Sequence, residues 1–239
     1  ELKHPTITTF VRMFLRVVDI YGWENTSIFK MDLKNAFGLL TVKPSQSRLL
    51  MSELTDNLTA VAHDGNFGMT GMPASFGVAS RVVARGVNKG ISGEADTYSD
   101  DTAGAGCTTE IKSDMEKSMH FCRNMYGSKS VNKKKCLYGT NMDIIGWNVS
   151  MKTRMVTITE INFLKLLHGF CAIDTSGSTN VRFMRKLSGI STRYSMLFRP
   201  LKALNSALYR SHGNLTGRNT FVPLQQDARI AIEIWRVSI

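Results

Sequence analysis

Apolar residues recur along three segments at steps of three and four positions, which is typical of amphipathic helices. These segments are predicted to be helices over residues 6–20, 73–88 and 111–126. Pro73 suits the first position of the second helix, and Gly127 is expected to end the third. In the first helix, the residues predicted to face the core are Ile7, Phe10, Phe14 and Val17.

Segments rich in strand-forming residues lie between these helices. A strand is predicted to end at Asp32, and another to run over residues 142–149. Residues 96–102 are predicted to form a hairpin whose tip is Ser99-Asp100-Asp101, because Ser and Asp favour turns. Residues 46–60 are predicted to be helical. This order suits an α+β fold, an antiparallel sheet with helices on one face.

The C-terminal part is predicted to be mainly helical. A helix is expected over residues 159–172, followed by a loop and two helices that Pro200 separates. Their apolar stripe, which alternates steps of four and three, is predicted to be core and consists of Phe183, Leu187, Ile190, Tyr194, Leu197, Leu201, Leu204 and Leu208. The basic residues at other positions are Arg182, Arg185, Lys186, Arg193, Arg199 and Lys202.

The distribution of charge along the chain indicates what kind of partner the protein binds. Of the net charge of +11, residues 151–239 carry +9, with 13 Lys and Arg against four Asp and Glu. Such a basic segment favours a polyanion, and nucleic acid is the natural one. Arg81, Arg85 and Lys89 fall four apart on the helix of residues 73–88, where they would line a groove.

Other features narrow the class of protein. No apolar run is long enough to span a membrane. The four cysteines lack metal-binding spacing, so reduced thiols are expected. The chain begins at Glu1 without Met, which leads us to expect a segment of a longer protein.

Asp100 and Asp101 stand out because two adjacent carboxylates repel each other unless a cation lies beside them. An acidic turn in solvent is the simpler interpretation. If the end of the Asp32 strand lies beside the hairpin tip, however, three carboxylates converge. Two metal ions held by shared carboxylates are the equipment of in-line phosphoryl transfer.

Taken in order, these segments resemble reverse transcriptases of LTR retrotransposons and pararetroviruses, of the gypsy or DIRS type. The matching motifs are residues 31–37 (Met-Asp-Leu-Lys-Asn-Ala-Phe), 66–76, Tyr98-Ser99-Asp100-Asp101, 131–136 and Ile145-Gly146-Trp147, with a weaker match over residues 182–209. Asn66 departs from the usual Pro of the second motif, and Gly71-Met72 from the usual Asn-Ala. Only 31 residues precede Asp32, which leaves little room for fingers.

The resemblance implies a right-hand polymerase palm followed by a mainly helical thumb. Residues 1–150 would be the palm with reduced fingers elements, 151–210 the thumb, and 211–239 the start of a connection segment or a tail. It also implies an RNA-dependent DNA polymerase that uses two Mg²⁺ ions, with Mn²⁺ as a substitute. The metal ligands would be Asp32, the Leu33 carbonyl, Asp100 and Asp101. Lys135, or Lys134 beside it, would protonate the pyrophosphate.

The implied nucleotide site consists of Leu33, Lys34, Asn35, Ala36, Phe37, Phe67 and Gly68. Phe37 would exclude a 2′-hydroxyl, the group that distinguishes RNA from DNA, although its ring would equally suit core packing. RNA-dependent RNA polymerases share this palm, but commonly carry an Asp at the position of Phe37. Phe37 therefore favours deoxynucleotides.

The implied primer and template contacts are Tyr98, Arg81, Arg85, Gly146, Trp147, Arg185, Lys186 and Arg193, with core packing an equal alternative for Trp147. Expected partners are an RNA or DNA template with primer, dNTPs, and ribonuclease H and fingers domains of a polyprotein, but no membrane. The expected location is the cytoplasm, the nucleus or a virus-like particle. The alternatives are an RNA-dependent RNA polymerase palm and a palm-like module that binds nucleic acid without catalysis.

Overall fold

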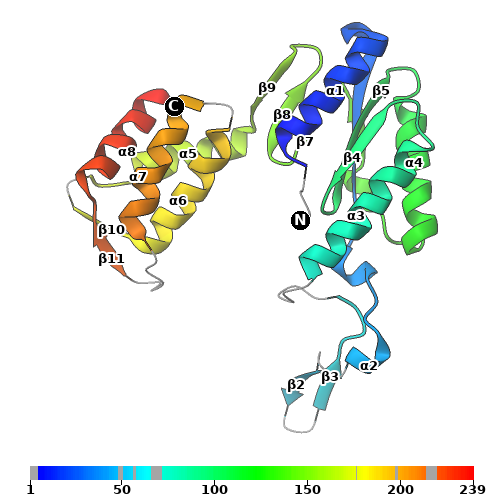
Figure 1. Cartoon of the computed structure of the whole chain (residues 1–239), viewed down its shortest axis with the longest axis horizontal. Coiled ribbons are helices and arrows are strands. Elements are labelled where there is room, and N and C mark those ends of the chain that lie inside the picture. The colour runs from blue at the N-terminus through cyan, green and yellow to red at the C-terminus, as the bar shows by residue number, and fades with distance from the viewer. Residues whose placement is uncertain are drawn as a thin grey trace. The chain divides into compact units, whose positions relative to one another are not determined.

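The computed structural model describes residues 5–47, 51–55, 58–65, 72–175, 177–196, 199–213 and 220–239. The chain divides into two compact units, Glu1–Thr157 and Ile158–Ile239, which carry the blue-to-green and the yellow-to-red colours in Figure 1. The division falls a few residues beyond the boundary expected at residue 150. Each unit is described by itself below.

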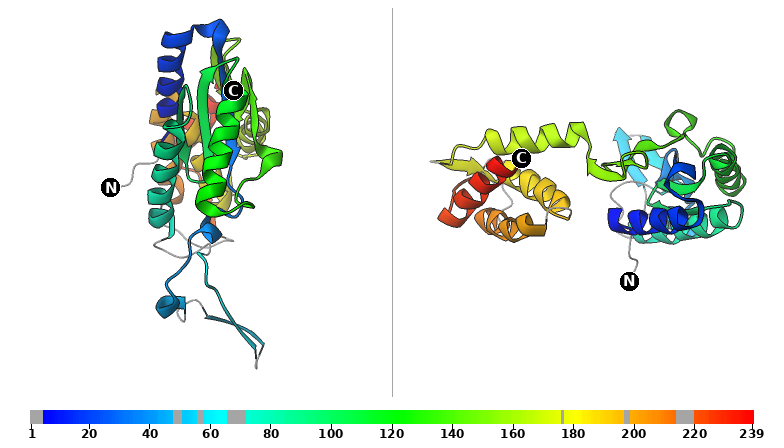
Figure 2. Two further views of the ribbon diagram at one scale, coloured as in Figure 1. Left: turned by 90° about the vertical axis from the view of Figure 1, so that its right-hand side faces the viewer. Right: turned by 90° about the horizontal axis from the view of Figure 1, so that it is seen from above.

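The first unit is built on an antiparallel sheet with the strand order β4-β5-β1-β6. These strands are β4 (Glu94–Tyr98), β5 (Asp101–Cys107), β1 (Thr26–Asp32) and β6 (Leu137–Gly139). Helices α3 (Met72–Asn88) and α4 (Ile111–Tyr126) pack on the sheet, and α1 (Ile7–Tyr21) packs against β4 and β5 (Figures 1 and 2). The predicted α+β class, the three helices, the Asp32 strand and the hairpin are therefore confirmed.

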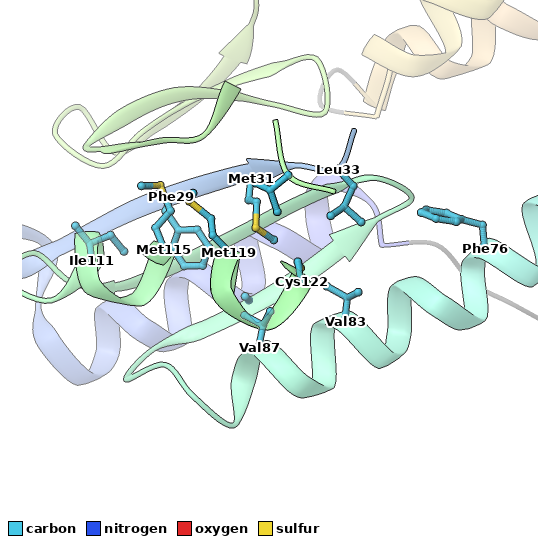
Figure 3. Packing of buried hydrophobic residues seen from close by; sticks show 12 residues of the cluster. Phe29, Met31, Leu33, Phe76, Val83, Val87, Ile111, Met115, Met119 and Cys122 are labelled. Atoms are coloured by element: carbon cyan, nitrogen blue, oxygen red, sulfur yellow. The ribbon is translucent and has the colours of Figure 1, made fainter. Parts of the chain in front are cut away.

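Alternation along β1 separates the cluster under α3 and α4 from the opposite face of the sheet, where Ile28 is also buried. Phe29, Met31 and Leu33 are buried in one cluster with residues of α3 and α4, including Val83 and Met115, and Figure 3 shows these side chains between the strand and the two helices. Because successive strand residues point to opposite faces, Ile28, Lys30 and Asp32 lie on the face away from this cluster.

Local signals in the sequence explain the ends of the helices. Thr6 caps α1 through a reciprocal hydrogen-bond pair with Thr9. Gly22 and Gly127, with φ of 77° and 95°, follow α1 and α4 in a backbone conformation that favours glycine. The expected end of the third helix at Gly127 is confirmed.

The helix predicted over residues 46–60 is wrong. The described part of this segment contains the end of a short helix, α2 (Pro44–Ser47), and an antiparallel pair of strands, β2 (Met51–Thr55) and β3 (Leu58–Val61). Thr55, Thr59 and Val61 are β-branched and favour strands, which explains why this segment is not helical.

The single strand predicted over residues 142–149 is also wrong, because the chain reverses in its middle. Strands β7 (Asn141–Ile144) and β8 (Trp147–Ser150) form a hairpin, to which β9 (Met155–Ile158) adds a third strand. The turn residues Ile145 and Gly146 have φ of 43° and 83°, as a two-residue hairpin turn requires. The turn expected from the family resemblance therefore exists at this position.

The second unit is mainly helical, as predicted. Its elements are α5 (Glu160–Cys171), β10 (Ser178–Asn180), α6 (Val181–Tyr194), α7 (Lys202–His212), β11 (Phe221–Pro223) and α8 (Gln226–Ser238). A 3₁₀ turn at Arg199–Leu201 contains Pro200 and precedes α7. Helix α8 packs on α5 and α7, and Trp235 stacks on Phe170 with ring centroids 5.1 Å apart. Residues 226–238 are thus an integral part of this unit.

The cysteines are all free thiols, in agreement with the expectation of a reduced protein. Cys122 is buried in the core of the first unit. Burial, and to a lesser degree neighbouring Cys136, raises its pKa to about 12. Since the thiolate is the reactive form, Cys122 is an inert core residue.

We expect Met31→Ala to lower the free energy of unfolding of the first unit by about 2–5 kcal/mol, because it opens a cavity in a closed core. Met31 is 1% exposed, whereas Met155 is 55% exposed. Met155→Ala is therefore the matched control and should change stability by no more than about 0.5 kcal/mol. Urea denaturation of both variants measures the difference; equal losses would contradict the assigned core.

Candidate active site

The register of the central strands brings two of the predicted carboxylates together. In the antiparallel pair of β1 and β5, Asp32 is directly opposite Asp101. Directly opposite residues point to the same face of a sheet, with Cβ atoms about 4.5–5.5 Å apart. Asp100 precedes Asp101 in the turn between β4 and β5. The three carboxylates predicted from separate segments therefore lie at one end of the sheet.

The turn that carries Asp100 is held from several sides. The Leu33 amide donates to the Asp100 carbonyl at 3.0 Å, and the Ser80 hydroxyl of α3 donates to the Ser99 carbonyl at 2.8 Å. Ser99 itself has φ of 54°, an uncommon conformation for a residue other than glycine. These hydrogen bonds hold Ser99 in a backbone conformation that is unfavourable for a serine by itself.

Lys135 joins the carboxylates from a third segment. Its Nζ lies 2.9 Å from Asp32 Oδ1. The 3₁₀ turn Lys133–Lys135 is fixed nearby, because the Asn132 amide donates to the Asp32 carbonyl at 2.9 Å. The hydrogen bond and the charge of Asp32 raise the pKa of Lys135. Lys134 and Lys135 were both considered for proton transfer, and Lys135 is the one that contacts Asp32.

Like charges dominate the electrostatics of this end of the sheet. Asp101 lies at the surface, but neighbouring groups displace part of its hydration. This loss of hydration raises the pKa of Asp101, and repulsion from Asp100 and Asp32 raises it further, while the positive charges of Lys30 and Lys135 oppose the rise. A site of three carboxylates and two ammonium groups has one negative charge in excess.

The carboxylates fit a divalent cation. Mg²⁺ prefers oxygen ligands such as carboxylates, and the ammonium group on Asp32 already balances part of their charge. Within the described residues, no group of three His, Cys, Asp or Glu side chains is arranged as a formed metal site.

The residues predicted to bind the nucleotide follow Asp32 directly. Leu33 is buried, whereas Lys34 and Asn35 are exposed. Asn35 has φ of 53°, and a 3₁₀ turn (Ala36–Leu39) follows it. Phe37 is half-buried and packs edge-on against Phe76, with ring centroids 5.4 Å apart. The predicted contacts Phe67 and Gly68 lie outside the described residues.

The predicted primer and template residues fall into two groups. In the first unit, Tyr98 is opposite Asp101 and 41% exposed, Gly146 lies in the β7–β8 turn, and Trp147 is buried in the core at 1% exposure. Because Trp147 is buried, its side chain has no surface that could contact nucleic acid. It packs in the core directly after the β7–β8 turn. The exposed basic residues are Arg81 and Arg85 on α3 and Arg185, Lys186 and Arg193 on α6 of the second unit.

Two residues that lie close to the carboxylate site, Ser80 and Lys30, were not identified in the sequence analysis. Ser80 holds the Ser99 carbonyl, and Lys30 points to the same face as Asp32. Strand periodicity offered a signal for Lys30, since it is two positions before Asp32. No local signal marks Ser80, because its contact joins a helix to a turn 19 residues away.

Three solved structures of a viral reverse transcriptase share the architecture of this chain. Over 89% of this chain, the foamy viral protease-reverse transcriptase in complex with RNA/DNA hybrid superposes with a TM-score of 0.61 at 14% identity. Its dRH form in complex with double-stranded DNA gives 0.64 at 13% identity, and the protein in complex with double-stranded DNA gives 0.58 at 15%. The chain has a reverse-transcriptase-like fold.

The likeness is one of structure over part of a larger protein. The chain spans 27%, 35% and 41% of those three reverse-transcriptase chains. No protein-family model and no curated protein sequence matches it. None of the described helices is both long and apolar enough to cross a membrane.

We expect Asp101→Asn to stabilise the protein near neutral pH in the presence of a chelator. With its raised pKa, folded Asp101 keeps its proton to a higher pH than in the unfolded chain. The free energy of unfolding therefore falls as pH rises from the ordinary Asp value through the folded pKa, and Asn removes this loss. The gain in Tm should vanish below the ordinary pKa of about 3.9.

Thermal melts of the wild type and the variant across this pH range measure the effect. Asp19→Asn, at an exposed position on α1, is the control and should leave Tm nearly unchanged. A lower Tm of Asp101→Asn at neutral pH would show that Asp101 is stabilised by its neighbours and would contradict the electrostatics described.

Proposed function

We propose that the protein is an RNA-dependent DNA polymerase that adds deoxynucleotides to a primer 3′ end. The observation that carries this proposal is the pairing of Asp32 with Asp101, beside Asp100 and Lys135, at one end of the sheet of a reverse-transcriptase-like fold. Three carboxylates from two segments and a lysine from a third match the parts that two-metal phosphoryl transfer needs.

In this proposal Asp32, Asp100 and Asp101, with the Leu33 carbonyl, hold two Mg²⁺ ions, for which Mn²⁺ can substitute. When bound, such ions lower the pKa of the primer 3′-hydroxyl and stabilise charge on the transferred phosphate. The protein contributes the fixed positions of the oxygens. The hydrogen bonds of Leu33 and Ser80 to the turn hold Asp100 in place for this purpose.

Lys135 is the proposed proton donor to the leaving pyrophosphate. Its ammonium group lies on Asp32, and its raised pKa keeps it protonated until it donates. A general acid must come within hydrogen-bond reach of the group that it protonates. The side chain is 63% exposed, so it is free to turn from Asp32 toward a phosphate.

Phe37 is the proposed selector of the sugar. Its half-buried ring is braced edge-on by Phe76, which suits a rigid wall that leaves no space for a 2′-hydroxyl. This arrangement favours deoxynucleotides over the ribonucleotides of an RNA-dependent RNA polymerase. Phe37 is thus the residue that separates these two candidate functions.

Template and primer are the proposed partners, as in the matched reverse transcriptases bound to RNA/DNA hybrid and double-stranded DNA. The exposed Arg185, Lys186 and Arg193 of α6 suit contacts with phosphates, and so do Arg81 and Arg85 of α3. Because the matched chains are longer, we propose that further domains of a polyprotein, including ribonuclease H, complete the enzyme.

We expect Asp100→Asn to reduce primer extension by about a thousandfold or more, because residues of a catalytic unit act together. Primer–template affinity should change by no more than a few fold. The test is single-turnover extension with Mg²⁺ on RNA and DNA templates, with affinity measured in parallel. Asp19→Asn is the control and should extend normally.

The possible outcomes separate the candidate functions. Near-normal extension by Asp100→Asn would contradict the assigned site. A wild type that binds primer–template but extends it with neither dNTP nor rNTP would instead favour a nucleic-acid-binding module without catalysis.

We expect Phe37→Ala to raise incorporation of rNTP relative to dNTP by about tenfold or more, since a steric block is removed. Phe121 is the matched control, because it is likewise a half-buried Phe packed on the same core. Phe121→Ala should cost similar stability without changing sugar preference. Single-nucleotide incorporation and thermal melts measure both; equal sugar preference in the two variants would assign Phe37 to the core alone.

A further inference from the structure

Lys30 lies on the same face of the sheet as the candidate carboxylates. It is two positions before Asp32 on β1 and opposite Ala103 on β5. The alternation of side chains along β1 places Lys30 and Asp32 on the same face. Lys30 is half-buried, which is uncommon for a lysine without a specific partner.

The partner of Lys30 is the β7–β8 hairpin. Its Nζ donates to the Asp143 carbonyl at 3.0 Å across 113 positions of sequence. The Asp143 carboxylate in turn accepts a hydrogen bond from Asn148 Nδ2 of β8 at 2.9 Å. Lys30 of β1 is therefore hydrogen-bonded to Asp143 of the hairpin. The side chain of Asp143 also joins the two strands of that hairpin, through Asn148.

This hairpin carries a strained turn toward the carboxylates. Ile145 has φ of 43°, a conformation that is a genuine outlier for a β-branched residue. Such conformations persist where the surrounding structure holds them. A cavity of about 210 Å³ separates Lys30, Asp101 and Ala103 of the sheet from Asp143, Ile145 and Gly146 of the hairpin. The Lys30 bond connects the two sides of this cavity.

We propose that Lys30 is a positioning residue that holds the β7–β8 hairpin, and with it the primer terminus, at a fixed distance from Asp32 and Asp101. The proposal rests on the proposed polymerase function and on the primer contact that the family resemblance implies for Gly146, a residue of the β7–β8 turn. Lys30 thus links the two sides of the cavity through one hydrogen bond, from β1 to β7.

The test compares Lys30→Met, which keeps the length of the side chain but removes the donor and the charge, with Lys30→Arg, which keeps both. Lys152→Met, at an exposed site in the turn between β8 and β9, removes the same charge elsewhere in the unit. Hydrogen exchange of the amides of residues 141–150 in the free protein reports on the hairpin. Extension at saturating primer–template and dNTP reports on primer placement.

In Lys30→Met we expect faster exchange in the hairpin, because local opening becomes easier. The maximal extension rate should fall by about ten- to a hundredfold, the scale expected for a misplacement of about 1 Å. Primer–template Kd should change by less than about twofold, since Lys30 adds little to the phosphate contacts. Lys30→Arg should restore exchange protection and most of the rate, and Lys152→Met should match the wild type.

Other results would overturn the proposal. Unchanged exchange and rate in an extending Lys30→Met protein would exclude Lys30 alone and leave the polymerase function intact. A wild type that extends no primer would exclude the polymerase function and, with it, the role in primer placement. If Lys30→Met does not fold, Lys30→Gln, with a shorter uncharged side chain, takes its place in the same measurements, with the same expected results.

Discussion

The antiparallel register of β1 and β5 determines where negative charge accumulates in this molecule. It sets Asp32 opposite Asp101, and the turn between β4 and β5 adds Asp100. Loss of hydration, and then repulsion from Asp100 and Asp32, raise the pKa of Asp101, so ionising all three groups costs free energy. A fold that tolerates such a cost must hold the backbone around it firmly, and hydrogen bonds from Leu33 and Ser80 do so.

The same strand also separates stability from chemistry. Phe29, Met31 and Leu33 of β1 are buried against α3 and α4, while Lys30 and Asp32 point to the other face. A shift of one residue in the register would exchange these two sets and bury charge in the core. The hydrophobic core therefore enforces the position of the carboxylates, and its residue Leu33 also bonds to the backbone of Asp100.

Sequence patterns predicted the parts of this arrangement that depend on local spacing. The helices, the Asp32 strand and the Asp100 hairpin follow from periodicity and turn chemistry, and the described structure contains each of them. The prediction failed at residues 46–60, where strand-forming Thr and Val outweigh a helical interpretation, and at residues 142–149, where a turn divides the segment. Both errors concern short elements, for which periodicity discriminates poorly.

The contacts between distant segments were beyond such reasoning. The Lys30 bond to the Asp143 carbonyl forms because the β7–β8 hairpin packs beside β1, on the face of the sheet that carries Lys30. No pattern in either segment predicts this packing. Burial of Trp147, left open between core and primer support, likewise follows from the packing of the unit. Motifs marked Asp32 and Lys135 as chemistry, but only the fold showed that the two side chains meet.

Charge is divided along the chain in a way that serves both tasks of the proposed enzyme. Residues 151–239 carry a net +9, whereas residues 1–150, with 17 basic and 15 acidic residues, carry only +2. A carboxylate site that must attract metal ions loses affinity when many basic residues neutralise it, whereas phosphate binding gains from each one. In the first unit, Lys30 and Lys135 lie close enough to Asp101 to oppose the rise in its pKa. Lys30 and Lys135 each have a hydrogen-bond partner. Their ammonium groups are therefore held at defined positions near the carboxylates.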